Sequence, residues 1–216
     1  MIYDLDIAKQ IAKFLLQINA IILQPEKPFK WASGWNSPIY CDNRKILSYP
    51  EIRNHIRQSL ASAIKNHFNK ADVIAGVATA GIPHGVLVAE ELGLPFIYVR
   101  NDYKGHGRKN KIEGNYEEGQ SVILIEDLIS SGKSSIDAAN SLKNEGMIVK
   151  GVISIFSYGL QTAIDNFNKN EIDIISLCNY DTLLPEALEK NFINSNDLET
   201  LKDWKKNPEK WKISHD

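Results

Sequence analysis

The segment 122–134 places polar and charged side chains where a buried strand meets a helix. The apolar run Val122–Ile125 predicts a strand that is buried on both faces. Two adjacent carboxylates, Glu126 and Asp127, stand where we expect that strand to end. Because ionised carboxylates accept hydrogen bonds from hydroxyl groups, this pair favours a ligand that presents a diol.

The turn after the acid pair has the composition of an anion site. The free N–H groups and the dipole at the start of a helix attract a phosphate, and the helix is expected to begin near Lys133. Ser130, Ser131 and Ser134 add hydroxyl donors, and Gly132 lets the backbone come close to the ligand. A ligand with a diol flanked by a phosphate therefore fits the whole segment.

This segment has two other possible interpretations. The run Gly132-Lys133-Ser134 suggests a nucleotide-triphosphate P-loop, but that motif needs a glycine five residues before Gly132, where this chain has Asp127. An isolated acid pair is also compatible with a solvated strand end. The ordered series of strand, acid pair, hydroxyl-rich turn and helix favours a ligand site.

The segment resembles the 5-phosphoribosyl-1-pyrophosphate signature of type I phosphoribosyltransferases. The resemblance implies that the acid pair holds the ribose hydroxyls and that the following turn holds the 5′-phosphate. The residues expected to contact this substrate are Glu126, Asp127, Leu128, Ile129, Ser130, Ser131, Gly132, Lys133 and Ser134. It also implies Mg²⁺, held by substrate oxygens and water rather than by a protein cluster.

A basic segment, 100–114, follows a second expected strand. Its glycines and its lack of apolar periodicity predict an exposed, flexible loop. Its basic residues are Arg100, Lys104, Arg108, Lys109 and Lys111. A solvated surface loop is one interpretation. The other is a lid whose cations stabilise a leaving pyrophosphate and exclude water.

This loop is similar to the catalytic loop of orotate phosphoribosyltransferases. By that resemblance Arg100, Lys104 and His106 act on pyrophosphate, and together with Asp127 they form the expected catalytic set. The resemblance also implies a homodimer in which the loop reaches the neighbouring subunit. The chain departs from some members of the family at Asn101, where they have a second basic residue.

A second small-residue turn follows the first expected sheet strand. Thr79, Ala80 and Gly81 precede a helix and are expected to bind the pyrophosphate of the substrate. Such turns also serve helix–strand packing, so the motif alone is weak. His84 is interpreted as a packed or capping histidine.

Segment 29–44 resembles the base-binding motif of the orotate enzymes, with Ser-Gly, Ser-Pro and Tyr-x-Asp-x-Arg at matching places. The residues expected to contact orotate are Tyr40, Cys41, Arg44 and Ser130. Orotate is an anion, so a cation should meet its carboxylate. Some family members supply an arginine after the fourth strand, but here that segment is Phe156-Ser-Tyr-Gly.

Arg44 is our candidate for this cation, with Ser130 at the other edge of the base. Two alternatives stay open: Arg44 pairs with Asp42 or a helix end, or Lys30 provides the charge.

The elements that must position these residues predict an α/β fold. A helix is expected around Ile7–Ile18 and a second one from Pro50, a position where proline is tolerated. Short apolar runs then alternate with helical segments, which predicts a parallel sheet with ligands at the carboxyl ends of its strands. These runs are Val73–Ala78, Phe96–Val99, Val122–Ile125, Val149–Ile155 and Ile172–Leu177.

The resemblance specifies this as the type I phosphoribosyltransferase fold, in one domain spanning 1–216. Residues 1–49 would form a hood that carries the base-binding loop. Residues 178–216 would form a helical cover, with short helices expected at Asp181–Lys190 and Asn196–Lys206.

Composition excludes several classes of function. The net charge of -2 gives no basic surface for a nucleic-acid partner. No apolar run reaches membrane-spanning length, and Cys41 and Cys178 lack disulfide or metal-ligand spacing, which indicates a cytoplasmic protein. A purine or xanthine phosphoribosyltransferase and a regulatory protein with this fold are the remaining rivals.

Overall fold

A six-stranded sheet forms the centre of the structure, a computed structural model that describes residues 1–31, 34–101 and 111–211. Neighbouring strands are parallel except for the last pair, which is antiparallel. The parallel α/β sheet predicted from the sequence is confirmed. The strand order is β10 (Ile174–Asn179), β9 (Ile148–Ser157), β8 (Ser121–Ile129), β5 (Val73–Val77), β6 (Phe96–Val99) and β7 (Ile112–Glu113).

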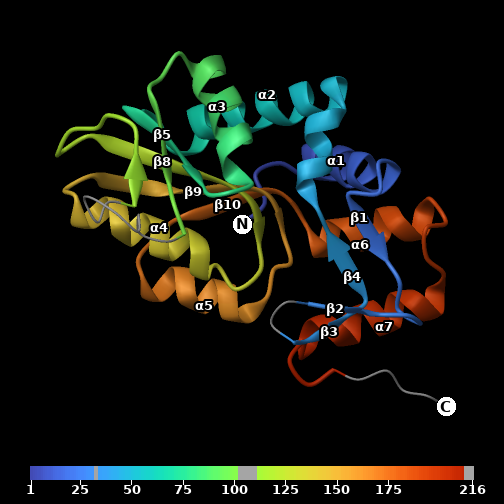
Figure 1. The fold of residues 1–216 in the computed structure, drawn as a ribbon. Coiled ribbons are helices and arrows are strands. Elements are labelled where there is room, and N and C mark those ends of the chain that lie inside the picture. Colours follow the sequence, from blue (N-terminus) through green and yellow to red (C-terminus); the bar gives the residue numbers. More distant parts are fainter. Residues whose placement is uncertain (32–33, 102–110, 212–216) are drawn as a thin grey trace.

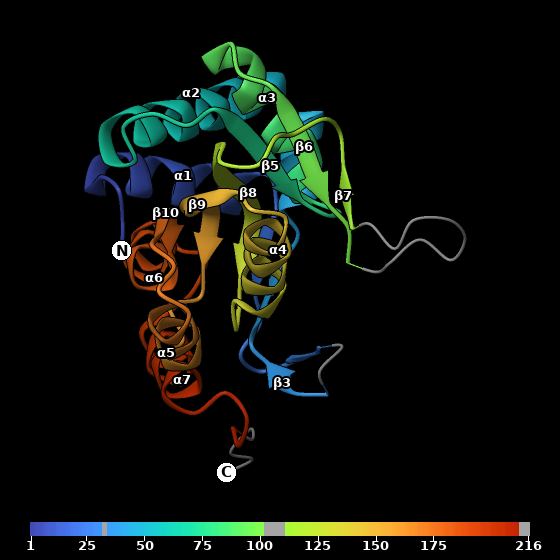
Figure 2. The ribbon, with the colours of Figure 1, turned by 90° about the vertical axis from the view of Figure 1, so that its left-hand side faces the viewer.

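Helices cover both faces of this sheet (Figures 1 and 2). Helices α1 (Leu5–Gln17), α2 (Pro50–His67) and α3 (Gly81–Leu92) lie on one face, and α4 (Lys133–Asn144) and α5 (Gln161–Lys169) lie on the other. Successive side chains of a strand point to opposite faces. In β8, Ile123 and Ile125 therefore join the core under α1–α3, while Val122 and Leu124 join the core under α4 and α5.

The two N-terminal helices begin where the sequence indicates. Asp4 caps α1, because its carboxylate accepts a hydrogen bond from the Ile7 N–H at 2.9 Å. Pro50 is the first residue of α2, as predicted.

The stretch 18–49, the part of the expected hood region 1–49 that follows α1, contains short elements. Strand β1 (Ile21–Leu23) pairs antiparallel with β4 (Ile39–Cys41), and β2 (Phe29–Lys30) pairs antiparallel with β3 (Asn36–Ser37). A 3-10 helix, η1 (Asn43–Ser48), follows. We call residues 18–49 the hood. Strands of two or three residues leave too little alternation to be predicted from sequence.

Two helices, α6 (Tyr180–Glu189) and α7 (Ser195–Lys206), close the described chain and confirm the two expected C-terminal helices. Figure 1 shows them beside the hood, away from α4. Trp204 of α7 is fully buried, and its indole N–H donates to the Asn36 main-chain oxygen at 3.2 Å. The C-terminal residues thus support the hood from far away in the sequence.

Among the helices of the described residues, none is long and apolar enough to cross a membrane.

Candidate active site

The site lies at the carboxyl ends of β5 and β8. These strands are neighbours, but the chain leaves β5 for β6 on one side and reaches β9 from β8 on the other. Such a switch point opens a crevice at the carboxyl edge of a parallel sheet. The residues predicted to bind substrate sit around this crevice, on β8, at the starts of α3 and α4, and on the hood.

Strand β8 is longer than the sequence indicated. It continues to Ile129, so the prediction that it ends at the acid pair was wrong. The reason is that β9 keeps pairing with β8 as far as Ile129–Ser157, whereas β5 stops pairing at Gly76–Ile125. The acid pair therefore belongs to a strand that is bonded on one side and open on the other.

Glu126 points into the protein. It is 6% exposed, one carboxylate oxygen accepts from the Asp127 N–H at 3.0 Å, and the other accepts from the Ser135 hydroxyl at 3.0 Å. Burial, and then the charge of Asp127, raise the pKa of Glu126 well above its usual range. Glu126 is thus a held carboxyl group that favours its neutral form.

Asp127 is only half-buried and is therefore the more accessible member of the pair. Burial raises its pKa, while a side-chain hydrogen bond with Glu126 and, to a smaller extent, the charge of Arg44 oppose that rise. Its main-chain oxygen accepts a hydrogen bond of 2.7 Å from the Asn43 side chain, which is itself fully buried. This bond ties the hood to β8 at the point where ligand is expected, and sequence reasoning missed Asn43 because its partner is far along the chain.

The turn after β8 has the shape of an anion site. Gly132 has a φ of +77°, which favours glycine, and α4 begins directly after it without a side-chain cap. Ser130 and Ser131 are half-buried, and Lys133 and Ser134 are exposed at the first turn of α4. The uncapped N–H groups of that turn are available to a phosphate.

Two of the predicted contact residues can offer only main-chain atoms. Leu128 packs against the core under α1–α3, and Ile129 is buried in the core under α4 and α5. Helix α5 braces the turn from below, because the Asn166 side chain donates to the Ser131 main-chain oxygen at 3.0 Å.

The second small-residue turn faces the same crevice edge. Gly81 begins α3, and a Cβ there would collide with the main-chain oxygen of Ile125, so only glycine fits. Thr79 is exposed and Ala80 is half-buried, and α3 has no side-chain cap. The close approach of Gly81 to β8 confirms the packing interpretation of this motif, while its role in binding pyrophosphate stays a prediction.

His84 of α3 is a packed histidine, as interpreted from the sequence. It is 2% exposed, and burial lowers its pKa to about 4. It is therefore neutral at physiological pH and unsuited to acid–base work there.

The basic segment is described only at its ends. Arg100 pairs with Glu113 at 3.4 Å, and its main-chain N–H donates to the Lys111 oxygen at 2.8 Å. Lys104 and His106 lie outside the described residues. Arg100, Lys111 and Lys133 line a cavity of about 140 Å³ beside the ends of β5 and β6.

The hood contributes Tyr40, Cys41 and Arg44. Arg44 is 65% exposed and donates to the Asp42 carboxylate at 2.6 Å, so the predicted alternative of an Arg44–Asp42 pair is confirmed. Burial, and then the charge of Asp127, raise the pKa of the Cys41 thiol. Tyr40 is partly exposed, and its ring lies 5.5 Å from that of Phe29.

Tyr158, at the end of β9, is the other residue that sequence reasoning missed. It is 2% exposed, and its ring centroid lies 4.9 Å from that of Trp31 in the hood. The sequence offered one signal, a tyrosine directly after a predicted strand, but nothing that placed it against the hood.

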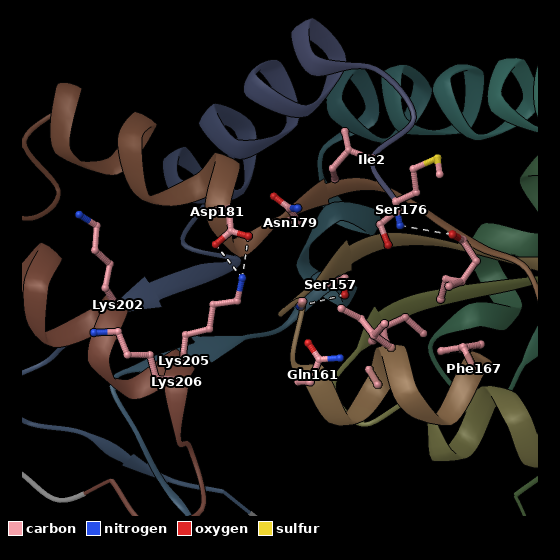
Figure 3. Close-up of a pocket in the computed structure, with 16 residues that line it drawn as sticks. Ile2, Ser157, Gln161, Phe167, Ser176, Asn179, Asp181, Lys202, Lys205 and Lys206 are labelled. Carbon is pink, nitrogen blue, oxygen red and sulfur yellow. Dashed lines mark hydrogen bonds and ion pairs between the residues drawn. The ribbon is translucent and has the colours of Figure 1, made fainter. Parts of the chain in front are cut away.

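A larger cavity, of about 490 Å³, lies between α5 and α7 (Figure 3). Of the predicted site residues only Ile129 lines it. Its Lys205 and Asp181 pair with each other at 2.6 Å. This cavity therefore brings together none of the expected chemistry.

Known proteins resemble this chain along most of its length. The phosphoribosyl transferase domain matches residues 42–175. An orotate phosphoribosyltransferase of Cytophaga hutchinsonii is 51% identical over 204 residues, covering 94% of this chain and 98% of that protein. One of Bacillus subtilis is 52% identical over 204 residues, covering 94% of each.

A solved structure shows the same fold. The crystal structure of orotate phosphoribosyltransferase from Aeropyrum pernix matches with a TM-score of 0.72 at 25% identity, covering 84% of this chain and 97% of that chain. The predicted type I phosphoribosyltransferase fold is thereby confirmed. With its acid pair on the open edge of β8 and relatives at about half identity, this chain belongs to the orotate phosphoribosyltransferase family.

Proposed function

We propose that this chain is a pentosyltransferase that moves the 5-phosphoribosyl group of 5-phosphoribosyl-1-pyrophosphate to orotate. The bond between C1 of ribose and pyrophosphate breaks, and a bond between C1 and a ring nitrogen of orotate forms. The products are orotidine 5′-monophosphate and pyrophosphate, a step towards UMP. The observation that carries this proposal is the acid pair on the open edge of β8, followed directly by an uncapped helix start.

Ribose 5-phosphate would lie along the end of β8. Asp127 would face the ligand and accept hydrogen bonds from the ribose hydroxyls, while Glu126 holds the Asp127 N–H and the Ser135 hydroxyl in place. The 5′-phosphate would sit on the turn 130–134. A carboxylate beside C1 also favours the positive charge that the sugar ring develops as pyrophosphate leaves.

Pyrophosphate would be received on the other side of the crevice. The turn Thr79–Gly81 offers N–H groups, and Arg100 stands at the end of β6. Lys104 and His106 complete the expected cation set by resemblance. The proposal includes a homodimer in which this loop serves the neighbouring subunit, and it rests on the family alone.

Orotate would lie between the hood and β8. Arg44 is held by Asp42 but, with a 65% exposed side chain, keeps N–H donors that can meet a carboxylate. Tyr40, Cys41 and Ser130 would border the same space. Because the pKa of Cys41 is raised, its thiol is a neutral contact rather than a nucleophile.

Mg²⁺ fits this site as a companion of the substrate. Among the described residues no three His, Cys, Asp or Glu side chains gather in a metal-binding group, and both oxygens of Glu126 are engaged. Asp127 is the carboxylate left to contact the ion, whose other ligands would be substrate oxygens and water. When bound, it would neutralise charge on pyrophosphate.

Two further expectations belong to this proposal. The hood and the helices after residue 178 would act with the sheet as one domain, which the Trp204–Asn36 hydrogen bond supports. A cytoplasmic location is supported by the free thiols Cys41 and Cys178.

The experiment is a base panel with the purified protein, 5-phosphoribosyl-1-pyrophosphate and Mg²⁺. Orotate, hypoxanthine, adenine, xanthine and uracil are offered in turn, and pyrophosphate release is measured. Turnover with orotate alone is expected. Turnover with a purine instead would overturn the base assignment, and tight substrate binding without turnover on any base would favour a regulatory protein.

A further inference from the structure

Tyr158 is held rigidly directly after β9, beside the end of β8. Its main-chain N–H donates to the Ile129 oxygen at 3.0 Å, which fixes it beside the end of β8. Its ring lies 4.9 Å from Trp31, 5.6 Å from Phe156 and 5.8 Å from Trp204, measured between centroids. An aromatic ring packed on three sides has little rotamer freedom, so the hydroxyl has a fixed position.

The hydroxyl of Tyr158 has no partner within the described part of the protein. No hydrogen bond joins it to a described residue, and its oxygen is not fully sealed from solvent. The small exposed part of this residue therefore includes its hydroxyl. Since buried tyrosine hydroxyls normally find a partner, a donor left open at a crevice is suited to a ligand.

The surroundings of this hydroxyl are those of the base site. The charges that act on it come from Cys41 of the hood, then from Tyr180, which lies in the core and outside the expected site, and then from Asp127 of β8 and Tyr40 of the hood. Burial, and then these groups, raise the pKa of Tyr158, so it stays a neutral O–H donor. A base bonded to a ribose that Asp127 holds would have to lie between Asp127 and the hood, within reach of this donor.

We propose that the Tyr158 hydroxyl donates a hydrogen bond to an acceptor oxygen of the pyrimidine, a carbonyl or the carboxylate, and so helps to select the base. The proposal rests on the function proposed above and adds a residue to it. A neutral donor fixed by three rings rejects a base that presents an N–H or a C–H at that place, because the hydroxyl would lose its partner.

The test is Tyr158→Phe, which keeps every ring contact and removes only the hydroxyl. The KM for orotate is expected to rise about tenfold, as for one lost hydrogen bond. The KM for 5-phosphoribosyl-1-pyrophosphate and kcat should change less than about twofold. The melting temperature should stay close to that of the unchanged protein.

Tyr180→Phe is the matched control. It removes a hydroxyl that donates to the Leu201 main-chain oxygen at 3.1 Å inside the core. It should lower the melting temperature and leave the KM for orotate unchanged.

An unchanged orotate KM in folded Tyr158→Phe would overturn the inference. So would a rise confined to the KM for 5-phosphoribosyl-1-pyrophosphate, which would place the hydroxyl at the ribose. Failure of the unsubstituted protein to use orotate would instead refute the proposed function, so the two failures are distinguishable.

Discussion

At the scale of single residues, the two acids of the pair have different surroundings. Both carboxylate oxygens of Glu126 accept hydrogen bonds from neighbouring protein groups, and its pKa is raised, whereas Asp127 is only half-buried. Their adjacency in the sequence suggested one shared role. In the proposed function, Glu126 holds its neighbours in place and Asp127 contacts the ligand.

This division predicts unequal effects of two substitutions. Asp127→Asn should lower kcat/KM by about 10²- to 10³-fold, because it removes the carboxylate that faces the developing positive charge. Glu126→Gln should lower it less, since glutamine resembles the neutral carboxyl that burial favours. Steady-state kinetics with both substrates measures the difference, with the exposed Asp203→Asn as a control that should change nothing. Equal losses from both substitutions would contradict the division.

A second residue-scale prediction concerns pH. Burial lowers the pKa of His84 to about 4 in the folded protein, against about 6.5 for a free histidine. The unfolded chain therefore binds this proton first, and His84 contributes stability that is full above pH 6.5 and lost as pH falls towards 4. The resulting decrease in the free energy of unfolding should approach about 3 kcal/mol.

Urea unfolding between pH 4 and 7 checks this value. The free energy of unfolding of His84→Gln should fall less over that window than the free energy of the unsubstituted protein. Identical pH dependence in both proteins would show that His84 does not carry the effect.

At the scale of elements, the sheet was predictable and its strand ends were not. The runs at 73–78 and 96–99 gave β5 and β6 nearly to the residue, because continuous apolar, β-branched runs are typical of buried parallel strands. The end of β8 depends on which neighbour keeps pairing with it, and that neighbour, β9, lies later in the chain. The pair β6–β7 was not predicted because β7 has only two residues.

At the same scale, α5 supports the turn 130–134, and a substitution of Gly132 tests this support. A Cβ at this glycine would lie 2.5 Å from the Phe167 ring of α5, at a backbone φ of +77°. Gly132→Ala should therefore displace the turn from α5 and raise the KM for 5-phosphoribosyl-1-pyrophosphate about tenfold or more, with a lower melting temperature.

Gly93→Ala is the matched control for this prediction. Gly93 also has a positive φ, +65°, but a Cβ there meets nothing within 4 Å. It should lower the melting temperature modestly and leave both KM values unchanged. If Gly132→Ala behaved in the same way, the bracing role of α5 would be refuted.

At the scale of the whole molecule, the crevice joins parts of the chain that are far apart in sequence. Asn43 reaches Asp127, Trp204 reaches Asn36, and Tyr158 packs on Trp31. The local motifs of the ribose and phosphate sites could be predicted, because each is a continuous segment between a strand and a helix. The base site could be predicted only in part, since its wall is formed by the hood, the end of β9 and α7 together.

The residue proposed to bind the orotate carboxylate could also be predicted only in part. The sequence proposed Arg44 and left a pair with Asp42 open, and the structure shows that pair. A side chain with two acceptable partners cannot be assigned from its position in a motif. The hydroxyl of Tyr158 had no motif at all, and only packing revealed it.

The central claim is that this crevice transfers phosphoribose to orotate, and product analysis tests it most directly. Protein, orotate, 5-phosphoribosyl-1-pyrophosphate and Mg²⁺ are incubated, and the products are separated, identified and quantified by mass spectrometry. One orotidine 5′-monophosphate and one pyrophosphate should appear for each orotate consumed, and Asp127→Asn should nearly abolish both. Pyrophosphate released without orotidine 5′-monophosphate, or full activity in Asp127→Asn, would contradict the account.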